Sequence, residues 1–149
     1  MSITFQFQGV KKPETFRSPV LRSWLKGLAK TQGRKLAALN YMFVSDEALL
    51  QVNLEYLQHH TYTDIITFNN ADAGEAIEGD IFISLDRVQD NAQKFVVKPE
   101  EELVRVMAHG LLHLCGFNDK KPKEKQAMRA AEDEAIRAYR SLKRKTKLF

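Results

Sequence analysis

Residues 109–119 read HGLLHLCGFND and hold the most informative spacing in this chain of 149 residues. His109 and His113 are four residues apart, so on an α-helix both imidazoles project from the same face. Gly116 is a natural helix stop, because glycine adopts the left-handed conformation at a helix end without penalty. The chain can then turn and bring Asp119 beneath the two rings. Two imidazoles and one carboxylate predict an open three-ligand site for zinc or a similar divalent ion, with water in the remaining position.

Histidines on an apolar helix are also often simple hydrogen-bonded core residues. The residues around both histidines are apolar nearly all round, which is typical of a buried helix. Burying His109 and His113 with no polar partner would be costly, so the metal site is the favoured interpretation. Cys115 points to another face and is expected to be a small apolar filler. Asn118 is a poorer third ligand than Asp119, because it is neutral and one residue out of register.

Length and composition indicate one domain, residues 1–149, with a real core. No apolar run approaches membrane-spanning length and no leader pattern opens the chain, so we expect a cytoplasmic protein with no membrane partner. A single cysteine excludes an intramolecular disulfide, which suits a reducing compartment. The net charge of +4 is uneven, since eleven Lys or Arg and four acids lie from Lys120 onward. This arm favours a polyanion such as nucleic acid, although a solvated basic tail explains the charge equally well.

Strand and helix periodicities alternate along the chain. Apolar patterning predicts strands at residues 3–7, 35–44, 65–68 and 79–84. One helix is predicted from Ser18, expected as its capping residue before Pro19, to Gly33. Further helices are predicted after a Ser45 cap as far as Leu57, at 86–96, and from Pro99 and Pro122 onward. In the helix at 86–96, Val88, Ala92 and Phe95 are expected to face inward. The order predicts an α+β fold in which helices pack a small mixed sheet and the metal-binding helix is buried at its centre, a zincin-like arrangement.

The HGLLHLCGFND stretch closely resembles the HGxLHLxGYDH signature of the YbeY family, metal-dependent endoribonucleases of bacterial rRNA maturation. Four further segments are similar to family patterns, in the same order. They are residues 52–56 (LNxxY), 62–68 (PTDVLSF), 78–84 (GDIxIS), and Met128 with Glu132 (MxxxE). The resemblance implies a mixed sheet with surrounding helices, a bound zinc, and single-stranded RNA as substrate. It also implies a role at the 3′ end of small-subunit rRNA on the ribosome and in ribosome quality control. His109 and His113 carry over directly as metal ligands.

Two positions depart from the family pattern. Asp119 stands where the third histidine is usual; it is a normal zinc ligand but lowers the positive charge of the site. We therefore expect a less acidified water and a preference shifted toward ions such as manganese, with nickel a further option. Leu57 stands where an arginine usually holds a phosphate. Lys120, Lys121 or the His59-His60 pair are the candidates to replace it, although both histidines also fit a solvated loop.

The pattern predicts metal-assisted cleavage of a phosphodiester, in which the ion activates water or polarises a phosphoryl oxygen. The sequence leaves open whether water or the RNA 2′-hydroxyl attacks, and it shows no evident general base. Asp64 and Asp80 are weak candidates, each more simply explained as a structural acid at a strand end.

Strand positions also suggest residues that could bind RNA. Phe68 and Ser84 are expected to line a cleft beside the metal together with Thr67. Phe68 would stack on a base there, although this residue type is more often core. Lys120 and Lys121 are the expected phosphate contacts.

Two other functions fit parts of the pattern. His109, His113, Gly116 and Asp119 also match the HExxHxxGxxH/D spacing of metalloproteases, but Gly110 stands where the catalytic glutamate is required. A non-catalytic RNA- or ribosome-binding factor with a structural metal is the second alternative, because the arginine and the base are both missing. Neither the physiological metal nor the oligomeric state can be read from the sequence.

Overall fold

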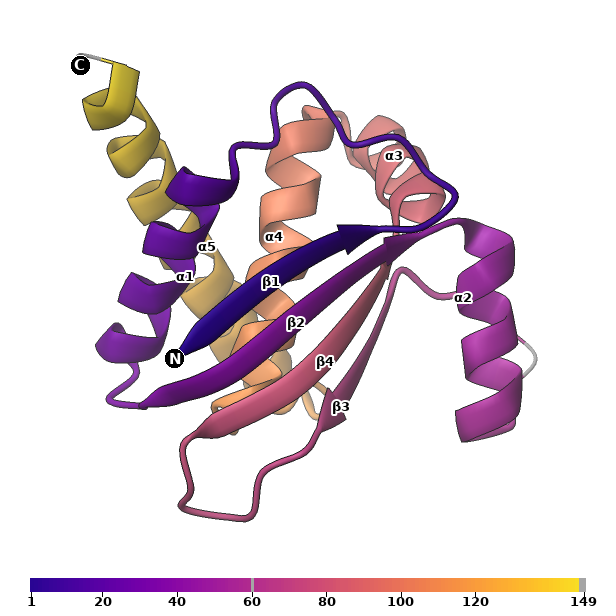
Figure 1. Cartoon of the computed structure of the whole chain (residues 1–149), viewed down its shortest axis with the longest axis horizontal. Coiled ribbons are helices and arrows are strands. Elements are labelled where there is room, and N and C mark those ends of the chain that lie inside the picture. Colours follow the sequence, from indigo (N-terminus) through magenta and orange to yellow (C-terminus); the bar gives the residue numbers. More distant parts are fainter. Residues whose placement is uncertain (60, 148–149) are drawn as a thin grey trace.

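A four-stranded mixed sheet organises the molecule, shown as a computed structural model in Figure 1. The structure describes residues 1–59 and 61–147. The strand order is β1-β2-β4-β3, with β1 (Ser2–Phe7), β2 (Leu36–Val44) and β4 (Ile77–Ser84) parallel to one another. The edge strand β3 (Ile65–Asn69) runs antiparallel to β4. This arrangement confirms the predicted α+β class with a mixed sheet.

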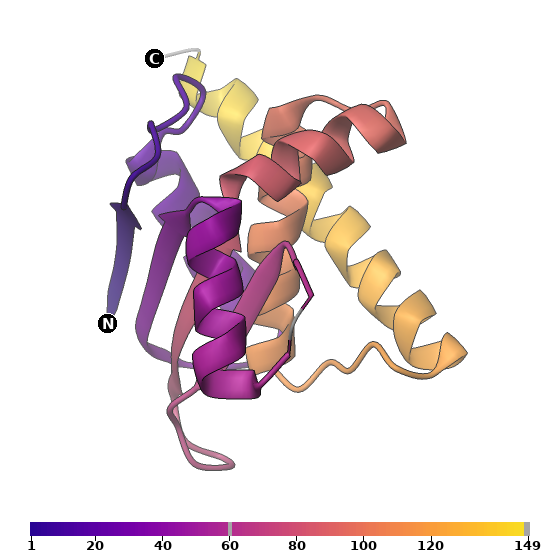
Figure 2. The ribbon, with the colours of Figure 1, turned by 90° about the vertical axis from the view of Figure 1, so that its right-hand side faces the viewer.

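Helices cover the two faces of the sheet unequally (Figures 1 and 2). Helices α1 (Ser18–Thr31), α4 (Pro99–Leu114) and α5 (Pro122–Lys147) pack together on one face, and α3 (Leu85–Phe95) packs against α4. Helix α2 (Asp46–Val52) continues into a short π-helical turn, η1 (Asn53–Leu57), on the opposite face. The main core lies under α1, α4 and α5, and a smaller cluster centred on Val44, Leu49 and Ile66 lies under α2. In the described part of the chain, no helix is long and apolar enough to cross a membrane.

Helix α4 is the most deeply buried helix, as its sequence predicts. Proline occupies its first turn together with three glutamates, which match the positive end of the helix dipole. Gly110 lets the helix approach β4 closely, because a Cβ at this position would lie 2.9 Å from Ile81 Cδ1 and 3.0 Å from Ile65 Cδ1. The Tyr41 hydroxyl of β2 donates a hydrogen bond of 2.8 Å to the Met107 carbonyl. The sheet and α4 are therefore closely packed, and this packing positions the residues at the C-terminal end of α4.

Three local expectations were wrong. The side chain of Phe95 is 57% exposed rather than inward, because α3 ends there and Val96 takes a left-handed conformation that turns the chain toward α4. Ser18 is the first helical residue and makes no capping bond; Arg17 precedes it in extended conformation. Strand β4 begins at Ile77, two residues before the predicted start, because pairing with β2 extends that far.

Candidate metal centre

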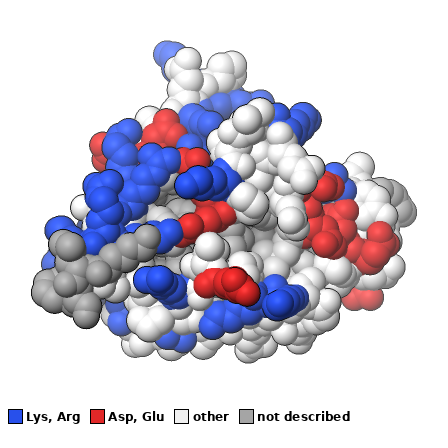
Figure 3. All heavy atoms as spheres, turned by 90° about the horizontal axis from the view of Figure 1, so that it is seen from above, with Lys and Arg blue, Asp and Glu red and all other residues white. Residues whose placement is uncertain are grey.

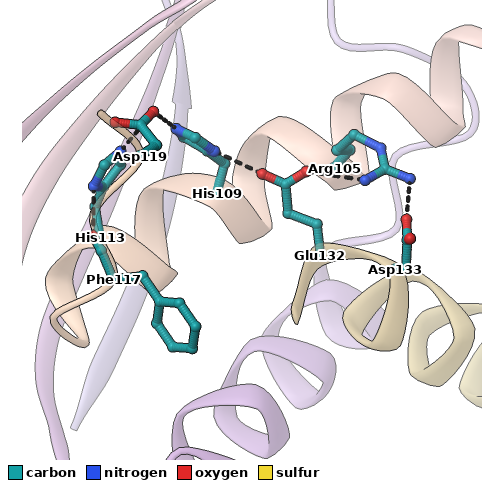
Figure 4. A network of polar contacts seen from close by, with 7 residues as sticks. All are labelled: Arg105, His109, His113, Phe117, Asp119, Glu132 and Asp133. Atoms are coloured by element: carbon teal, nitrogen blue, oxygen red, sulfur yellow. Dashed lines mark hydrogen bonds and ion pairs between the residues drawn. The ribbon is translucent and has the colours of Figure 1, made fainter. Parts of the chain in front are cut away.

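Three side chains meet at the C-terminal end of α4 (Figure 4). His109 and His113 project from the last two turns of the helix, and their ring centroids are 4.5 Å apart. Gly116, at φ +109°, turns the chain back so that Asp119 reaches both rings. Asp119 Oδ2 lies 3.3 Å from His109 Nε2 and 3.5 Å from His113 Nε2. The spacing argument thus predicted the convergence of these side chains correctly.

The opposite nitrogen of each imidazole is held by an oxygen. His109 Nδ1 lies 2.6 Å from Glu132 Oε2, and His113 Nδ1 lies 2.9 Å from the Phe117 carbonyl oxygen. A carbonyl oxygen and a carboxylate can only accept hydrogen bonds, so both Nδ1 atoms donate. Neutral rings in this tautomer direct the Nε2 lone pairs toward Asp119, which is the orientation that metal-ligating histidines adopt in proteins.

The spacing of Asp119 Oδ2 from the two imidazole nitrogens fits a small divalent ion, and all three donor atoms lie within 4.8 Å of one another. A tetrahedral zinc with ligands at about 2.0–2.1 Å has neighbouring ligand atoms about 3.3–3.4 Å apart. The two distances from Asp119 Oδ2, 3.3 and 3.5 Å, are close to that edge. Two nitrogens and one oxygen form a normal zinc donor set and leave a fourth position free. The residues present therefore have the geometry and chemistry to hold such an ion.

Glu132 connects the histidine pair to α5, and sequence reasoning missed this role. Its carboxylate accepts from His109 through one oxygen and from Arg105 Nη1, at 2.9 Å, through the other. Arg105 Nη2 in turn donates to Asp133 Oδ1 at 2.7 Å (Figure 4). Glu132 is only 5% exposed. The only sequence signal was the match of Glu132 and Met128 to the MxxxE pattern, which carries no information on contacts.

These contacts control the charge of the buried groups. Burial by itself lowers the pKa of His109, but the hydrogen bond and charge of Glu132, with Asp119 and Asp64, reverse the effect and raise it. Burial likewise opposes the charge of Arg105, and the bonds to Asp133 and Glu132 outweigh it and raise the pKa. The Arg105 guanidinium holds the pKa of Asp133 below its usual range. The network therefore favours the charged forms of Arg105 and Asp133, and it raises the pKa of His109, which faces the cleft.

A cleft of about 610 Å³ opens beside the three side chains. Its lining includes His109, His113 and Asp119, together with Tyr62 and Asp64 from the segment that leads into β3. Burial raises the pKa of the Asp64 carboxyl, and its own backbone N–H and the charge of His109 oppose this only in part. Asp64 is therefore a stronger base than an exposed aspartate, and it lines the same cleft as the histidine pair.

Asp80, the other predicted base, lies on the wrong face of the sheet. Its neighbour Ile81 faces α4, so alternation along β4 directs Asp80 away from the cleft. There it accepts hydrogen bonds of 2.9 Å from Asn40 Nδ2 and Asn70 Nδ2. Asp80 therefore has the structural role at a strand that the sequence favours as its simpler explanation.

The prediction that Phe68 and Ser84 line the cleft is also wrong. Phe68 packs edge-on against Tyr56 and Phe82 in the small cluster under α2. Ser84 is fully buried at the start of α3, where its hydroxyl accepts from Arg87 N. Thr67 does line the cleft, because the register puts it on the same face as Ile81.

The predicted cationic contacts divide into two groups. His59 and Leu57 line the cleft, whereas His60 lies outside the described residues. Lys120 and Lys121 are exposed directly after Asp119, at the entrance to α5. Among the described residues that line the cleft, none is a lysine or arginine.

Gly110 bears on the metalloprotease alternative. Proteases with this histidine spacing need a glutamate at that position, reaching into the active-site cleft. Gly110 instead abuts the side chains of Ile81 and Ile65, so a larger residue would displace the packing between α4 and the sheet.

Fold and site together define a class of protein: an α+β domain whose buried helix ends in a His-x3-His pair, completed by a carboxylate after a glycine turn. The model of the family described as "Endoribonuclease YbeY" matches residues 5–140. The chain therefore belongs to the YbeY family, as the sequence motifs predicted.

Individual relatives agree with this assignment. Endoribonuclease YbeY of Bacteroides thetaiotaomicron is 46% identical over 136 residues, which are 91% of this chain and 98% of the relative. Endoribonuclease YbeY of Cytophaga hutchinsonii is 54% identical over 116 residues, 78% of this chain and 81% of the relative. The solution structure of TM1509 from Thermotoga maritima has a TM-score of 0.69 and 22% identity, covering 97% of this chain and 93% of that one. The structural likeness supports the fold alone.

Proposed function

We propose that this protein is a metal-dependent endoribonuclease that cleaves single-stranded RNA in the cytoplasm. Its family and the name Endoribonuclease YbeY of its relatives support the reaction. Maturation of the 3′ end of small-subunit rRNA and ribosome quality control are the proposed setting, as the motif resemblance implies. The observation that carries the proposal is the convergence of His109, His113 and Asp119 beside an open cleft.

Zinc is the proposed cofactor, held by His109 Nε2, His113 Nε2 and an Asp119 oxygen. When bound, a divalent ion supplies Lewis-acid chemistry: it neutralises charge on a phosphoryl oxygen or acidifies a water molecule. The anionic Asp119 makes manganese and nickel the next ions to test. Glu132 and Phe117 keep the Nδ1 protons in place, so both rings stay in the ligating tautomer without rearrangement.

Asp64 is the proposed proton acceptor. Cleavage requires removal of a proton from the attacking hydroxyl, whether this belongs to water or to the RNA 2′ position. Asp64 lines the cleft, and its raised pKa makes it a better base than an exposed aspartate.

The substrate backbone needs positive partners that the cleft lining does not contain. His59 is the proposed hydrogen-bond donor to an RNA phosphate inside the cleft, where Leu57 replaces the arginine of the family pattern. Outside it, the exposed Lys120 and Lys121 follow Asp119 directly and form no ion pair with any described acid. They are the proposed contacts for phosphates that flank the cleavage point.

The far end of α5 is a weaker candidate for the same role. It is rich in lysine and arginine, but these residues lie among acids on the face seen in Figure 3. Arg140 pairs with Glu101, and Lys143 Nζ lies 2.5 Å from Glu100 Oε2. The acidic first turn of α4 therefore neutralises part of that end, which favours the lysines beside Asp119.

The test measures bound metal and RNA cleavage in the same preparations. Wild type should bind about one divalent ion and cleave single-stranded RNA faster than duplex, and a chelator should abolish cleavage. His113→Ala and Asp119→Ala should lose both properties, whereas Asp72→Ala, an exposed acid in a surface loop, should keep both. Equal metal content in all four proteins would refute the assignment of the metal site. Cleavage that survives chelation would refute the metal-dependent mechanism.

The same proteins separate an enzyme from a binding factor. Rescue of an rRNA-maturation defect by wild type but not by His109→Ala supports catalysis. Equal rescue by both would favour the non-catalytic alternative.

A further inference from the structure

An aromatic ring stands at the cleft beside the histidine pair. Tyr62 lines this cleft, and it is 47% exposed, so much of its ring is accessible from the cleft side of the molecule. It belongs to the segment between η1 and β3.

The ring is held in place from two sides. The Tyr62 hydroxyl donates a hydrogen bond of 3.0 Å to Glu47 Oε1 of α2. The guanidinium of Arg87, from α3, lies 5.4 Å from the ring centroid, and its Nη2 is tied to Asp46 Oδ2 at 2.6 Å. The ring is thus in contact with a fixed cation, and about half of the residue stays exposed at the cleft.

The backbone on both sides of Tyr62 is anchored as well. Asn53, which is 3% exposed, donates from Nδ2 to the Thr61 carbonyl at 2.7 Å. The Asp64 carbonyl accepts from Ser84 N at 2.9 Å, which joins the segment to the end of β4. A ring held by its backbone, its hydroxyl and a stacked guanidinium loses little freedom when a ligand covers it.

We propose that Tyr62 is a stacking platform for one unpaired base of the RNA, next to the nucleotide that is cleaved. The inference rests on the proposed ribonuclease function and assigns a substrate-positioning residue to it. An exposed aromatic face accepts any base, whereas a base inside a duplex is stacked on its neighbours and is not free to reach the ring. Tyr62 therefore contributes to the preference for single strands without reading sequence.

Tyr56 provides a matched control within the same region. It is also an exposed tyrosine, at 67%, but it packs edge-on against Phe68 at a centroid distance of 5.8 Å and does not line the cleft. Removing its ring changes exposed aromatic area by a similar amount without touching the proposed platform.

The experiment compares steady-state cleavage of a single-stranded oligoribonucleotide by full-length variants. Tyr62→Ala and Tyr62→Leu should raise KM about 5- to 150-fold, which corresponds to about 1–3 kcal/mol of stacking per base, with a smaller change in kcat. Tyr62→Phe keeps the ring and should change KM less than about 5-fold. Tyr56→Ala should match wild type. Melting curves check that every variant is folded.

Abasic substrates separate stacking from a structural role. For wild type, removing one particular base beside the cleavage point should raise KM, and in Tyr62→Ala the same removal should have no further effect. An abasic penalty of equal size in both proteins, or an unchanged KM in Tyr62→Ala and Tyr62→Leu, would overturn the platform while leaving the ribonuclease proposal intact.

Failure of the ribonuclease proposal gives a different result. If wild type cleaves no RNA, titration of an oligoribonucleotide that carries 2-aminopurine still reports stacking through quenching of its fluorescence. Quenching that wild type and Tyr56→Ala produce, and that Tyr62→Ala does not, supports the platform on its own; equal quenching by all three overturns it.

Discussion

Glu132→Gln is the substitution that best tests how the candidate metal centre is supported. The Glu132 carboxylate accepts two donors, His109 Nδ1 at 2.6 Å and Arg105 Nη1 at 2.9 Å. A glutamine has one acceptor oxygen, so in either orientation its NH2 group faces a donor, and at 5% exposure water cannot readily replace the lost bond. An unsatisfied buried group costs about 1–3 kcal/mol, more when the partner is charged.

Two quantities should change together. The metal-free variant should unfold about 2–12 °C below wild type, at about 2–4 °C per kcal/mol for a chain of this size. Loss of the outer partner of a ligating histidine should weaken zinc binding about 10- to 100-fold. Thermal unfolding after chelation measures the first, and competition with a chromophoric chelator measures the second.

Glu134→Gln is the matched control, because it makes the same chemical change two residues along α5. The Glu134 side chain is 74% exposed and pairs only with Arg137, so the free energy of unfolding should stay within about 0.5 kcal/mol. Wild-type zinc affinity in Glu132→Gln would refute the argument that this carboxylate orients His109. A loss of stability without a loss of affinity would restrict Glu132 to holding α5 against α4.

Three further predictions follow from the same geometry. Folding raises the pKa of Asp64, so the ionised carboxylate destabilises the fold at pH values above its unfolded pKa. Asp64→Asn should therefore raise the Tm of the metal-free protein at pH 7, and this gain should vanish in acid. The same substitution should lower the rate of RNA cleavage about 100-fold or more. Reversing the charges of Lys120 and Lys121 to glutamate should reduce the slope of log affinity against log salt by about 1.4 for single-stranded RNA, and the same reversal at residues 144–145 should leave it nearly unchanged. Gly110→Glu should abolish stable folding, seen as loss of the cooperative melting transition, because it would bury a carboxylate between α4 and the side chains of Ile81 and Ile65. A folded variant with protease activity would contradict that packing.

Features that depend on neighbours in the sequence could be predicted from the chain alone. The apolar run after Pro99, the spacing of His109 and His113, and the glycine at 116 are local, and an α-helix converts that spacing directly into a shared face. The return of Asp119 needs only a turn of three residues. The convergence of these side chains was therefore predictable, and so was the family.

Features that depend on which face of an element is covered were decided by tertiary structure. Strand periodicity says that Asp80 and Ile81 point to opposite faces, but not which face α4 will cover. For the same reason Phe68 was directed away from the cleft, and Phe95 was left outside because α3 ends at that residue.

The outer support of the centre was the least predictable part. Glu132 lies 23 residues after His109 on another helix, and only the packing of α5 against α4 brings the two together. Tyr62 is similar, because its exposure depends on where Glu47 and Arg87 come to lie around it. The sequence by itself determined that His109 and His113 share one helix face within reach of Asp119, since helix geometry relates residues four apart and a short turn follows Gly116. The tertiary structure alone decided which carboxylate supports His109 and which ring faces the cleft, because contacts between elements depend on packing that no local pattern records.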